Sequence, residues 1–510
     1  MDGRNLGRLA AATMDRLGDY PSLYFEGTWY ASGDQHVRAD RVSAGLRTLG
    51  VTPGSRVVVM MANCPEVFVA YHAIWRAGAV VTPAIFLITE PELRHIVTDS
   101  GAVAVIASAE LLPKILPAVA GLQVTVVSTG LREPVPGVVD FADVESAAAA
   151  ELVDVPPGDL AALLYTGGTT GRSKGVPLSH EALSAGGAAA REVTYVPGVT
   201  RGVLALPLAH SYGMLVTVGG LHAVERPVTA LQRWFQPAGW LALAQEHRVQ
   251  MAAVVPSMLA MLLAQPLEEF DLSELRYVSS GAAPLPAALR MEFERRVPSV
   301  SMMEGYGCTE TAGIISATPP GRYKPGAVGI PVPGVEVRIV SPAGEPVPAG
   351  EDGEIVVRGP NVMRGYWSQT AGSMTDGWFA TGDIGRLDTD GYLSIVDRKK
   401  DLIIRGGYNV YPRDVEDVML SHPAVVAAAV VGRGDDRLGE EVVAFVAVRP
   451  DATVAVEDLM AYAKANLSAI KYPRDIRIVD AIPLTSVGKV DRKRVRALAA
   501  DPATSPSDSS

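Results

Sequence analysis

One short segment of the sequence combines the residue types that can hold a phosphate chain. The segment reads Tyr165-Thr166-Gly167-Gly168-Thr169-Thr170-Gly171-Arg172-Ser173-Lys174-Gly175, and it follows the apolar run 160–164. Glycines let backbone N–H groups turn toward one anion, threonines add hydroxyl donors, and an arginine and a lysine supply positive charge. Lysine is scarce in this chain, with nine among the 45 basic residues, so a lysine in such a loop stands out. We predict a polyphosphate-binding loop at residues 165–175.

Two known motifs can be compared with this segment. A Walker P-loop cannot be placed, because no G-x-x-x-x-G-K-[ST] pattern occurs here. Residues 171–175 match G-x-S-x-G, the nucleophile elbow of hydrolases, which needs a helix directly after the serine. Val176-Pro177 begins a helix poorly, which disfavours the hydrolase interpretation. A flexible surface loop is the other alternative, and six consecutive Gly and Thr residues shortly before a Lys-Gly pair argue against it.

A later motif has the groups that a purine base and a magnesium ion require. Gly305-Tyr306-Gly307-Cys308-Thr309-Glu310 places an aromatic ring between two glycines, which lets a planar base approach that ring. A single carboxylate beside phosphates is how Mg²⁺ is usually bound, because this ion keeps several waters. Alone, Tyr306 could be a core aromatic residue and Glu310 a solvated surface acid. Their order after the glycine-rich loop favours the functional interpretation.

The C-terminal part adds candidate groups for a ribose, a thiol and a carboxylate. An aspartate after a tight turn, as in Thr381-Gly382-Asp383, can accept both hydroxyls of a ribose. The run Arg398-Lys399-Lys400 is typical of a solvated basic turn, and we expect Lys399 to face solvent. The glycines of Arg405-Gly406-Gly407-Tyr408 could let a thiol slide past the backbone. Lys489 would be an ordinary surface lysine but for the Pro-x-Thr and Gly that precede it.

The elements that must position these residues follow from the apolar pattern. Strand-like runs at 55–61, 79–82, 103–107 and 124–128 alternate with helical periods at 65–77 and 91–100. Such alternation predicts an α/β fold with doubly wound, mostly parallel sheets. Further strands are expected in the centre of the chain, at 161–165, 203–206, 249–255 and 275–279.

The pattern of apolar and polar residues changes after about residue 325. Residues 335–340, 354–358 and 392–397 alternate like antiparallel strands. A small α+β unit follows, with helices at 412–420 and 456–467 and strands at 425–431 and 442–448. We expect a large part at residues 1–399, a small domain at 400–498 and a disordered tail at 499–510.

Composition limits the classes of function. The chain has 510 residues, 48% hydrophobic and 20% charged, which is ordinary for a globular protein. A net charge of −11 argues against a general nucleic-acid or anionic-membrane binder, because nothing would offset phosphate repulsion. Two cysteines, Cys64 and Cys308, exclude a disulfide framework or a cysteine-rich zinc site. The N-terminus lacks a signal-peptide pattern, and 251–264 is too short to cross a bilayer, so we expect a cytoplasmic protein.

In this order the motifs resemble those of the adenylate-forming enzymes, the superfamily of acyl-CoA synthetases, peptide-synthetase adenylation domains and luciferases. The resemblance runs from about residue 30 to about residue 497, and Gly168 stands where serine is commoner. It points to the acyl-CoA synthetases and fatty-acid–CoA ligases. It implies a β-rich subdomain in the large part, and a small domain that swings between two catalytic poses.

The resemblance also implies a role for each motif. The implied catalytic residues are Lys174, His210, Thr309, Glu310 and Lys489. Implied contacts of ATP and AMP are Thr166, Gly167, Gly168, Thr169, Thr170, Gly171, Lys174, Gly281, Ala282, Ala283, Pro284, Gly305, Tyr306, Gly307, Thr309, Asp383, Arg398 and Lys489. Mg²⁺ would accompany ATP at Glu310 and Thr166, and the hinge would be Lys400. Coenzyme A would pass Arg405, Gly406, Gly407 and Tyr408, and the acyl group would lie beside His210, Ser211, Tyr212, Gly213 and Gly281.

The implied reaction joins a carboxylic acid to the thiol of coenzyme A, with ATP cleaved to AMP and pyrophosphate. Transfer to the phosphopantetheine thiol of a carrier protein, or no thioester step, are alternatives within this chemistry. Residues 399–510 hold 16 basic and 16 acidic residues, and this balance favours free coenzyme A. A non-catalytic ATP sensor is the alternative from a different class, and the retained Glu310 and Lys489 speak against it.

The segments beside the acyl pocket indicate the class of acid. No Arg or Lys occurs in 211–218, 251–255 or 258–262, so a second carboxylate would stay unpaired, at a cost of several kcal/mol. Gly219 and Gly220 could leave a channel for a chain. We therefore expect a monocarboxylic acid with an uncharged tail: a medium-to-long-chain fatty acid first, an aryl acid next. The competing interpretation makes these segments core helices.

Overall fold

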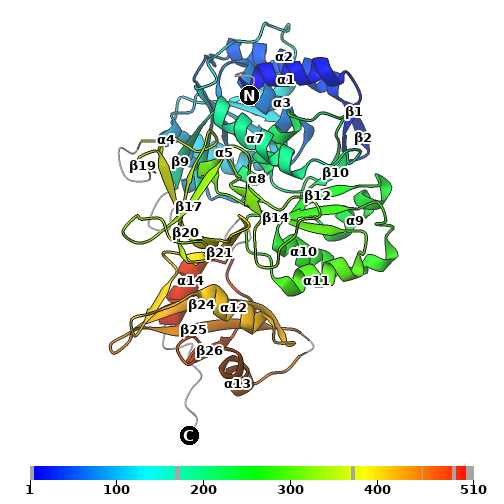
Figure 1. Cartoon of the computed structure of the whole chain (residues 1–510). Helices are drawn as coiled ribbons and strands as arrows, with labels where there is room; N and C mark the ends of the chain where they lie inside the picture. Colours follow the sequence, from blue (N-terminus) through cyan, green and yellow to red (C-terminus); the bar gives the residue numbers. More distant parts are fainter. Residues whose placement is uncertain (1–4, 167–172, 369–373, 451, 485–489, 501–510) are drawn as a thin grey trace. The chain divides into compact units, whose positions relative to one another are not determined.

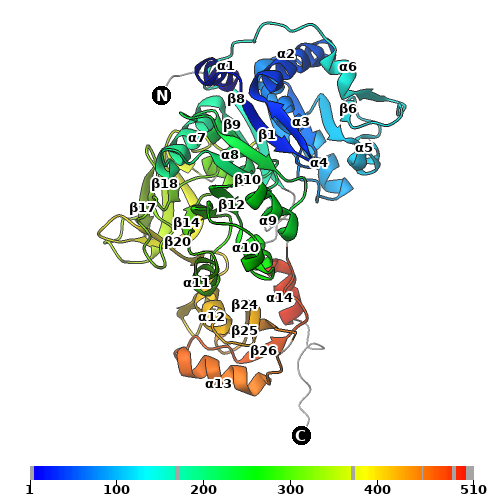
Figure 2. The same ribbon diagram turned by 90° about the vertical axis from the view of Figure 1, so that its right-hand side faces the viewer.

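The computed structural model describes residues 5–166, 173–368, 374–450, 452–484 and 490–500. The chain divides into two compact units, shown from two directions in Figures 1 and 2. The first unit comprises Met1–Leu285, Leu289–Val337 and Val357–Phe379, and the second comprises Pro286–Ala288, Arg338–Val356 and Ala380–Ser510.

A seven-stranded sheet in the first unit has the order β7-β6-β5-β3-β4-β8-β9. All its strands run parallel except β9, which returns antiparallel along β8. Parallel strands that are covered on both faces need continuous apolar runs, and 57–60 and 104–107 are such runs. The strands are β3 (Arg56–Met60), β4 (Val80–Pro83), β5 (Ala104–Ser108), β6 (Thr125–Thr129), β7 (Val138–Asp140), β8 (Leu160–Thr166) and β9 (Lys174–Ser179).

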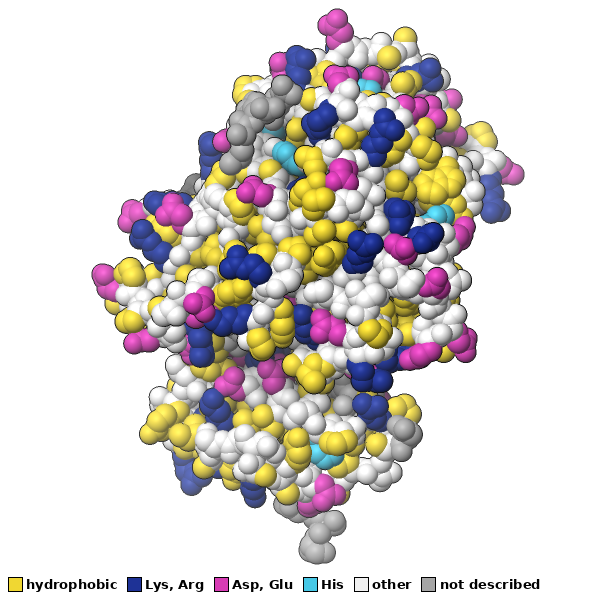
Figure 3. All heavy atoms as spheres, turned by 45° about the vertical axis from the view of Figure 1, so that its right-hand side comes forward, with side chains coloured by type: hydrophobic (Ala, Val, Ile, Leu, Met, Phe, Trp, Pro, Cys, Tyr) yellow, Lys and Arg dark blue, Asp and Glu magenta, His cyan; other side chains and the backbone are white. Residues whose placement is uncertain are grey.

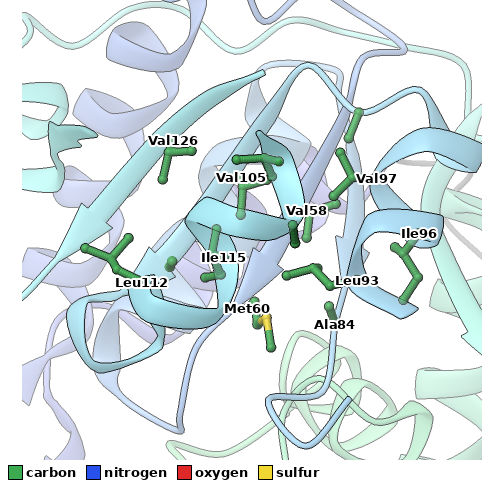
Figure 4. Close-up of a cluster of buried hydrophobic side chains, with 14 residues drawn as sticks. Val58, Met60, Ala84, Leu93, Ile96, Val97, Val105, Leu112, Ile115 and Val126 are labelled. Carbon is green, nitrogen blue, oxygen red and sulfur yellow. The ribbon is translucent and has the colours of Figure 1, made fainter. Parts of the chain in front are cut away.

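Helices accompany this sheet along the chain. Figure 4 shows Leu93 and Val97 of helix α4 beside Val58 of β3, in a buried cluster that also includes Ile96 and Val105 of β5. A capping box of Thr89 and Glu92 begins α4, and Gly101 ends it in a left-handed conformation. The helices are α1 (Leu6–Leu17), α2 (Ser32–Thr48), α3 (Pro65–Arg76), α4 (Glu90–Ser100), η1 (Ala109–Leu111), α5 (Leu112–Val119) and α6 (Phe141–Glu145).

A nine-stranded sheet completes the first unit, in the order β16-β15-β14-β13-β12-β10-β11-β1-β2. Its six central strands, β14 to β1, are parallel, and the strands at both edges are antiparallel. The strands are β1 (Pro21–Phe25), β2 (Thr28–Ala31), β10 (Arg201–Leu204), β11 (Val228–Leu231), β12 (Met251–Val254), β13 (Tyr277–Ser280), β14 (Ser301–Tyr306), β15 (Ser316–Ala317) and β16 (Ile330–Pro331). The helices in this part of the chain are α7 (His180–Thr194), α8 (Ser211–Gly220), α9 (Pro237–Glu246), α10 (Pro256–Leu263), η2 (Leu267–Glu269), α11 (Ala287–Arg296) and η3 (Thr309–Thr311).

Two five-stranded sheets follow. The first has the order β17-β18-β20-β19 with β21 beside β20, and the second has the order β23-β22-β25-β24 with β26 beside β25. Their strands are β17 (Glu336–Val340), β18 (Gly353–Arg358), β19 (Met374–Thr375), β20 (Trp378–Leu387), β21 (Leu393–Arg398), β22 (Ile403–Arg405), β23 (Tyr408–Val410), β24 (Val425–Asp435), β25 (Gly439–Val448) and β26 (Asp475–Ile478). Helices α12 (Pro412–Leu420), α13 (Val456–Asn466) and α14 (Arg492–Ala500) accompany the second sheet.

The predicted α/β class is confirmed, and the predicted elements differ from the observed ones mainly at their ends. Strands β24 and β25 pair as far as Asp435 and Gly439, beyond the apolar residues that defined the predicted strands. Backbone pairing continues through polar residues, which the apolar pattern does not detect. The predicted boundary between residues 399 and 400 falls inside the second unit and stays a prediction. Residues 501–510 of the predicted tail lie outside the described residues, and Ala500 ends α14.

Charged side chains of both signs are interspersed over the face shown in Figure 3, with hydrophobic side chains between them. Within the described part of the chain, no helix is long and apolar enough to cross a membrane.

Candidate functional site

The β8–β9 hairpin flanks the predicted phosphate loop on both sides. Thr166 and Lys174 face each other where the two strands meet the loop, and Tyr165 pairs with Gly175. Residues 167–172, which carry many of the predicted ATP contacts, lie outside the described residues. Since a strand follows the loop where a hydrolase would have a helix, the nucleophile-elbow interpretation is excluded.

Helix α4 holds both strands of this hairpin. His95 Nε2 lies 2.9 Å from the carbonyl oxygen of Ser173, the residue before β9. The phenol of Tyr165, in β8, donates to Asp99 Oδ2 at 2.6 Å. Burial and this carboxylate raise the pKa of Tyr165, so the phenol remains a donor at neutral pH. The positions where the chain enters and leaves the loop are therefore both tied to one helix.

Trp367 ties the same hairpin and helix together. Its indole Nε1 donates to the carbonyl oxygen of Asp99 at 3.0 Å, and its backbone N–H donates to the carbonyl oxygen of Gly175 at 2.9 Å. A Cβ atom at position 175 would lie 2.8 Å from Trp367 Cβ. Gly175 is thus needed for close packing, in addition to any role toward a phosphate.

Glu310 lies in the short η3 turn, which packs against β9. Its Oε1 accepts a hydrogen bond from the Tyr366 phenol at 2.8 Å. Lys174 Nζ lies 5.2 Å from the centroid of the same tyrosine ring. Burial, and then the Glu310 carboxylate, raise the pKa of Tyr366, which keeps this phenol protonated. The structure thereby brings two predicted site residues, Lys174 and Glu310, to one aromatic side chain that no motif of the sequence indicated.

The two glycines beside Tyr306 serve different purposes. Tyr306 ends β14, and its carbonyl oxygen accepts the N–H of Ile315 at 2.7 Å. A Cβ at position 307 would lie 2.5 Å from the carbonyl oxygen of Gly313, closer than real Cβ atoms approach backbone. A Cβ at position 305 would meet nothing nearer than 3.8 Å. Packing therefore requires Gly307, whereas room for a base remains the explanation for Gly305.

Gly307→Ala is expected to lower the free energy of unfolding by about 1–3 kcal/mol, the usual cost of overpacking. Gly305→Ala is the matched control, and its stability should stay within about 0.5 kcal/mol of the wild type, since its Cβ has space. Urea denaturation of both variants measures the difference. Equal destabilisation by the two substitutions would contradict the packing explanation.

The Ser280–Pro284 motif begins where β13 ends. Ala282 has φ +67°, a backbone conformation that costs a residue with a Cβ about 1–3 kcal/mol and that is concentrated at ligand sites. A Cβ at position 281 would lie 3.2 Å from the ring of Tyr212. The Tyr212 phenol donates to the backbone carbonyl of Ser279 at 3.2 Å, and burial raises its pKa to about 12. The predicted adenine motif and the predicted acyl residue Tyr212 are therefore in contact.

His210 is the N-cap of α8, where its Nδ1 accepts the N–H of Tyr212 at 3.1 Å. Gly213, which the resemblance also placed beside the acyl group, is buried in the helix.

Helix α8 is largely a core element. Met214, Leu215 and Val218 are buried, as the competing interpretation of 211–218 supposed. Close approach of α7 and α8 requires Gly187, where a Cβ would meet the backbone N of Gly219 at 3.0 Å, whereas a Cβ at position 219 would lie 3.6 Å from the Gly187 carbonyl oxygen, an ordinary contact. A Cβ at position 220 would meet nothing within 4 Å, so packing requires neither Gly219 nor Gly220, and the chain channel stays a prediction.

The predicted ribose residues are adjacent in the second unit. Asp383 and Arg398 pair across β20 and β21, with Nε and Oδ1 3.0 Å apart. Asp383 is 5% exposed. Lys399 is exposed, as predicted, and its Nζ lies 2.7 Å from Glu354 Oε2.

The predicted coenzyme A segment forms a two-residue hairpin between β22 and β23. Gly406 and Gly407 have φ +57° and +82°, the left-handed pair that such a turn requires. Arg405 faces the sheet and makes a two-pronged ion pair with Glu441 at 2.6 and 3.0 Å. Tyr408 is 60% exposed. Turn geometry accounts for both glycines, and contact with coenzyme A stays a prediction for all four residues.

The predicted hinge, Lys400, lies in a turn after β21. Its carbonyl oxygen is 3.3 Å from Arg496 Nη2 of α14. The next residue, Asp401, is buried and pairs with Arg496 at 2.6 Å. Lys489 lies outside the described residues, but Leu484 and Val490 on either side of it form a β-bridge.

Glu310 suits a magnesium ion that arrives with ATP. Within the described ranges, no group of three or more His, Cys, Asp or Glu residues could hold a metal ion alone. Mg²⁺ bound with a nucleotide takes one or two protein carboxylates and completes its shell with phosphate oxygens and waters. A carboxylate in η3 and the hydroxyl of Thr166 beside the loop supply the hard oxygen donors that this mode needs.

Sequence reasoning missed four residues that organise the site: His95, Asp99, Tyr366 and Trp367. None belongs to a motif with a chemical signature. The only local signal is the adjacent aromatic pair, Tyr366-Trp367, in a polar segment soon after a predicted strand.

Comparisons with known proteins define the family. Residues 10–367 match the AMP-binding enzyme family, and residues 414–489 match the AMP-binding enzyme C-terminal domain. The chain therefore belongs to the AMP-binding enzyme family. Its enzyme class is acid–thiol ligase of the adenylate-forming type, and the family implies ATP and coenzyme A as substrates.

Individual relatives cover nearly the whole chain. A feruloyl-CoA synthase from Amycolatopsis is 36% identical, over 90% of this chain and 92% of that protein. A long-chain-fatty-acid–CoA ligase from Bacillus subtilis is 32% identical, over 97% of this chain and 94% of that protein. The crystal structure of ATP-bound MatB from Rhodopseudomonas palustris is similar with a TM-score of 0.89 and 32% identity, over 98% of this chain and 99% of that one.

Proposed function

We propose that the protein activates a monocarboxylic acid with an uncharged tail as its acyl-adenylate and transfers the acyl group to coenzyme A. A medium-to-long-chain fatty acid is the proposed substrate, and an aryl acid is the second candidate. The observation that carries the proposal is the placement of Lys174 and Glu310 around the Tyr366 ring, beside the hairpin that flanks the glycine-rich loop.

In the first half-reaction, a carboxylate oxygen of the acid attacks the α-phosphorus of ATP, and the bond to the leaving pyrophosphate breaks. Two anions must approach each other, so positive groups fixed in the site lower the barrier. Lys174, in β9, offsets the charge of the phosphates. Lys489 contacts the carboxylate and the phosphate. Glu310 and Thr166 would hold Mg²⁺, which would supply further neutralisation of phosphate charge. Tyr306 stacks on the adenine, Thr309 contacts a phosphate oxygen, and Asp383 with Arg398 binds the ribose.

In the second half-reaction, the thiolate of coenzyme A attacks the acyl carbonyl carbon, and AMP leaves with the bonding pair. The mixed anhydride is sensitive to water, so a closed site protects it between the two steps. The small domain turns at Lys400 and presents Arg405–Tyr408 to the thiol. The exposed Tyr408 and the tight Gly406–Gly407 turn support this segment as one that a slender pantetheine chain can pass.

ATP–pyrophosphate exchange that depends on a carboxylic acid tests the first half-reaction. An enzyme exchanges label between pyrophosphate and ATP, whereas a non-catalytic ATP sensor binds ATP without exchange. Thioester formation is then compared with free coenzyme A and with a phosphopantetheinylated carrier protein. Absence of exchange with every acid would overturn the proposed function, and a preference for the carrier protein would replace the acceptor.

The uncharged segments near the site support the class of acid. Residues 211–220, 251–254 and 256–263 hold no charged side chain. Tyr212, in the first of these segments, donates a hydrogen bond to Ser279 and lies beside Gly281. A dicarboxylate would lack a partner there, at a cost of several kcal/mol. The aromatic ring of Tyr212, beside Gly281, favours an aryl acid as the second candidate. The relatives include both classes, a feruloyl-CoA synthase and a long-chain-fatty-acid–CoA ligase.

We expect kcat/KM to be highest for octanoate or dodecanoate, lower for benzoate and ferulate, and lowest for malonate. Pyrophosphate release in the presence of coenzyme A measures all five acids. Malonate as the best substrate would contradict the charge argument, and ferulate or benzoate in first place would establish the aryl alternative.

A further inference from the structure

Tyr366 contacts two charged groups of the proposed nucleotide site at once. Its phenol donates to Glu310 Oε1 at 2.8 Å, and its ring lies 5.2 Å from Lys174 Nζ, within the range of a cation–π contact. The two side chains have opposite charge and lie on neighbouring elements, η3 and β9. In the described part of the chain, neither forms an ion pair with another side chain.

The segment that carries Tyr366 is anchored at both ends. The buried Asn361 donates through Nδ2 to the carbonyl oxygens of Thr311 and Ile314, at 2.8 and 2.7 Å. The N–H of Met363 donates to the carbonyl oxygen of Glu310 at 2.8 Å. Trp367 holds the other end through the carbonyl oxygens of Gly175 and Asp99. Tyr366 is therefore presented by a fixed stretch of chain, and not by a loose loop.

These two contacts of Tyr366 have a chemical consequence. A glutamate has three rotatable bonds, and a lysine has four, so both groups would otherwise sample many positions. If they paired directly, each charge would be neutralised by the other, and neither would be available to a metal–phosphate complex. A phenol that holds one carboxylate oxygen leaves the second oxygen for a ligand, while the ring face attracts the ammonium group without neutralising it.

We infer that Tyr366 is a positioning residue of the nucleotide site, whose phenol orients the Glu310 carboxylate and whose ring holds the Lys174 ammonium. The inference rests on the proposed function, because it assigns both groups to a metal–ATP complex. In this role Tyr366 acts through Glu310 and Lys174, and not on the reacting atoms.

Two substitutions separate the contributions of the phenol and the ring. Tyr366→Phe keeps the ring beside Lys174 and removes the hydrogen bond to Glu310, whereas Tyr366→Leu removes both. The chain offers a matched control in Tyr195, whose phenol donates to Glu225 Oε1 at 2.6 Å and whose ring centroid lies 5.2 Å from Arg191 Cζ. Tyr195→Phe therefore makes the same chemical change outside the predicted site.

The decisive readout is equilibrium binding of ATP, measured with and without Mg²⁺ and in the absence of any acid. For Tyr366→Phe we expect unchanged binding of metal-free ATP and an about tenfold smaller gain in affinity from Mg²⁺, the usual effect of losing a group that orients a metal ligand. Tyr366→Leu should also weaken binding of metal-free ATP. Binding of Mn²⁺ to the enzyme–ATP complex, followed by electron paramagnetic resonance, should report the same loss. Tyr195→Phe should match the wild type.

If Mg²⁺ raised the affinity of Tyr366→Phe for ATP as much as it raises that of the wild type, the inference would be overturned. If Tyr366→Leu fails to fold, Tyr366→Phe decides alone, since it preserves the packed ring. Failure of the proposed function gives a different result: the wild type would then show no acid-dependent pyrophosphate exchange, while the binding contrast between the tyrosine variants could still be measured.

Discussion

Lys489→Ala is expected to lose most of the adenylation activity and to keep most of the thioester activity. Removal of one fixed group that stabilises developing charge typically lowers a rate by about 10²–10³. We expect that loss in acid-dependent pyrophosphate exchange, because Lys489 is proposed to contact the carboxylate and the phosphate in the first half-reaction only. When preformed acyl-adenylate is supplied, coenzyme A should be acylated at a rate close to that of the wild type.

The matched control for this variant is Lys493→Ala. Lys493 is an exposed lysine in α14, four residues further along the same domain. It should leave both half-reactions unchanged, which shows that loss of one positive charge from this domain has no general effect. An equal fall of both half-reactions in Lys489→Ala would contradict the assigned role.

Lys400→Pro is expected to separate the half-reactions in the opposite sense. Proline fixes φ near −65°, which stiffens the position at which the small domain is proposed to turn. Adenylation should continue, while the thioester rate should fall by about tenfold or more, equivalent to about 1.4 kcal/mol in the barrier. Single-turnover measurement of acyl-adenylate formation and of its consumption by coenzyme A resolves the two steps.

The surroundings of Lys400 make this substitution interpretable. The backbone N–H groups on either side, of Lys399 and Asp401, donate to the carbonyl oxygens of Gly382 and Arg398, both at 2.9 Å. Lys400→Ala is the control for charge, and it should retain both steps. Lys399→Pro is the control for damage to the turn, because it removes the hydrogen bond to Gly382. Equal rates of both steps in Lys400→Pro would place the pivot elsewhere.

A rotation at Lys400 would have to break hydrogen bonds that join residues before Lys400 to residues after it. The N–H of Arg413 donates to Asp397 Oδ2 at 2.9 Å, and Arg413 Nη1 donates to the carbonyl oxygen of Ile395 at 3.0 Å. Both acceptors precede Lys400, and Arg413 follows it. These two hydrogen bonds identify the interactions that the proposed rotation would have to break and re-form.

The sequence by itself determined the features that depend on short spacings. Helices that alternate with buried strands produce a period that is visible in any window of a dozen residues, so α3, α4 and β3 to β6 could be predicted within one or two residues. The glycine-rich loop and the Gly305–Glu310 motif are likewise contiguous, and their chemistry depends on the local order of residue types. The same order sufficed to indicate the family, which the comparisons confirmed.

Only the tertiary structure decided which partners hold those motifs in place. Trp367 reaches Asp99 across 268 residues of sequence, and Tyr366 reaches Glu310 across 56. No periodicity or local motif encodes such pairs, because packing of separate elements creates them. The same reason explains why the structure assigns Gly307 to packing, and Arg405 to an ion pair with Glu441. Spacing along the chain indicates which chemistry is available, whereas the packing of distant segments determines which atoms are held close enough to perform it.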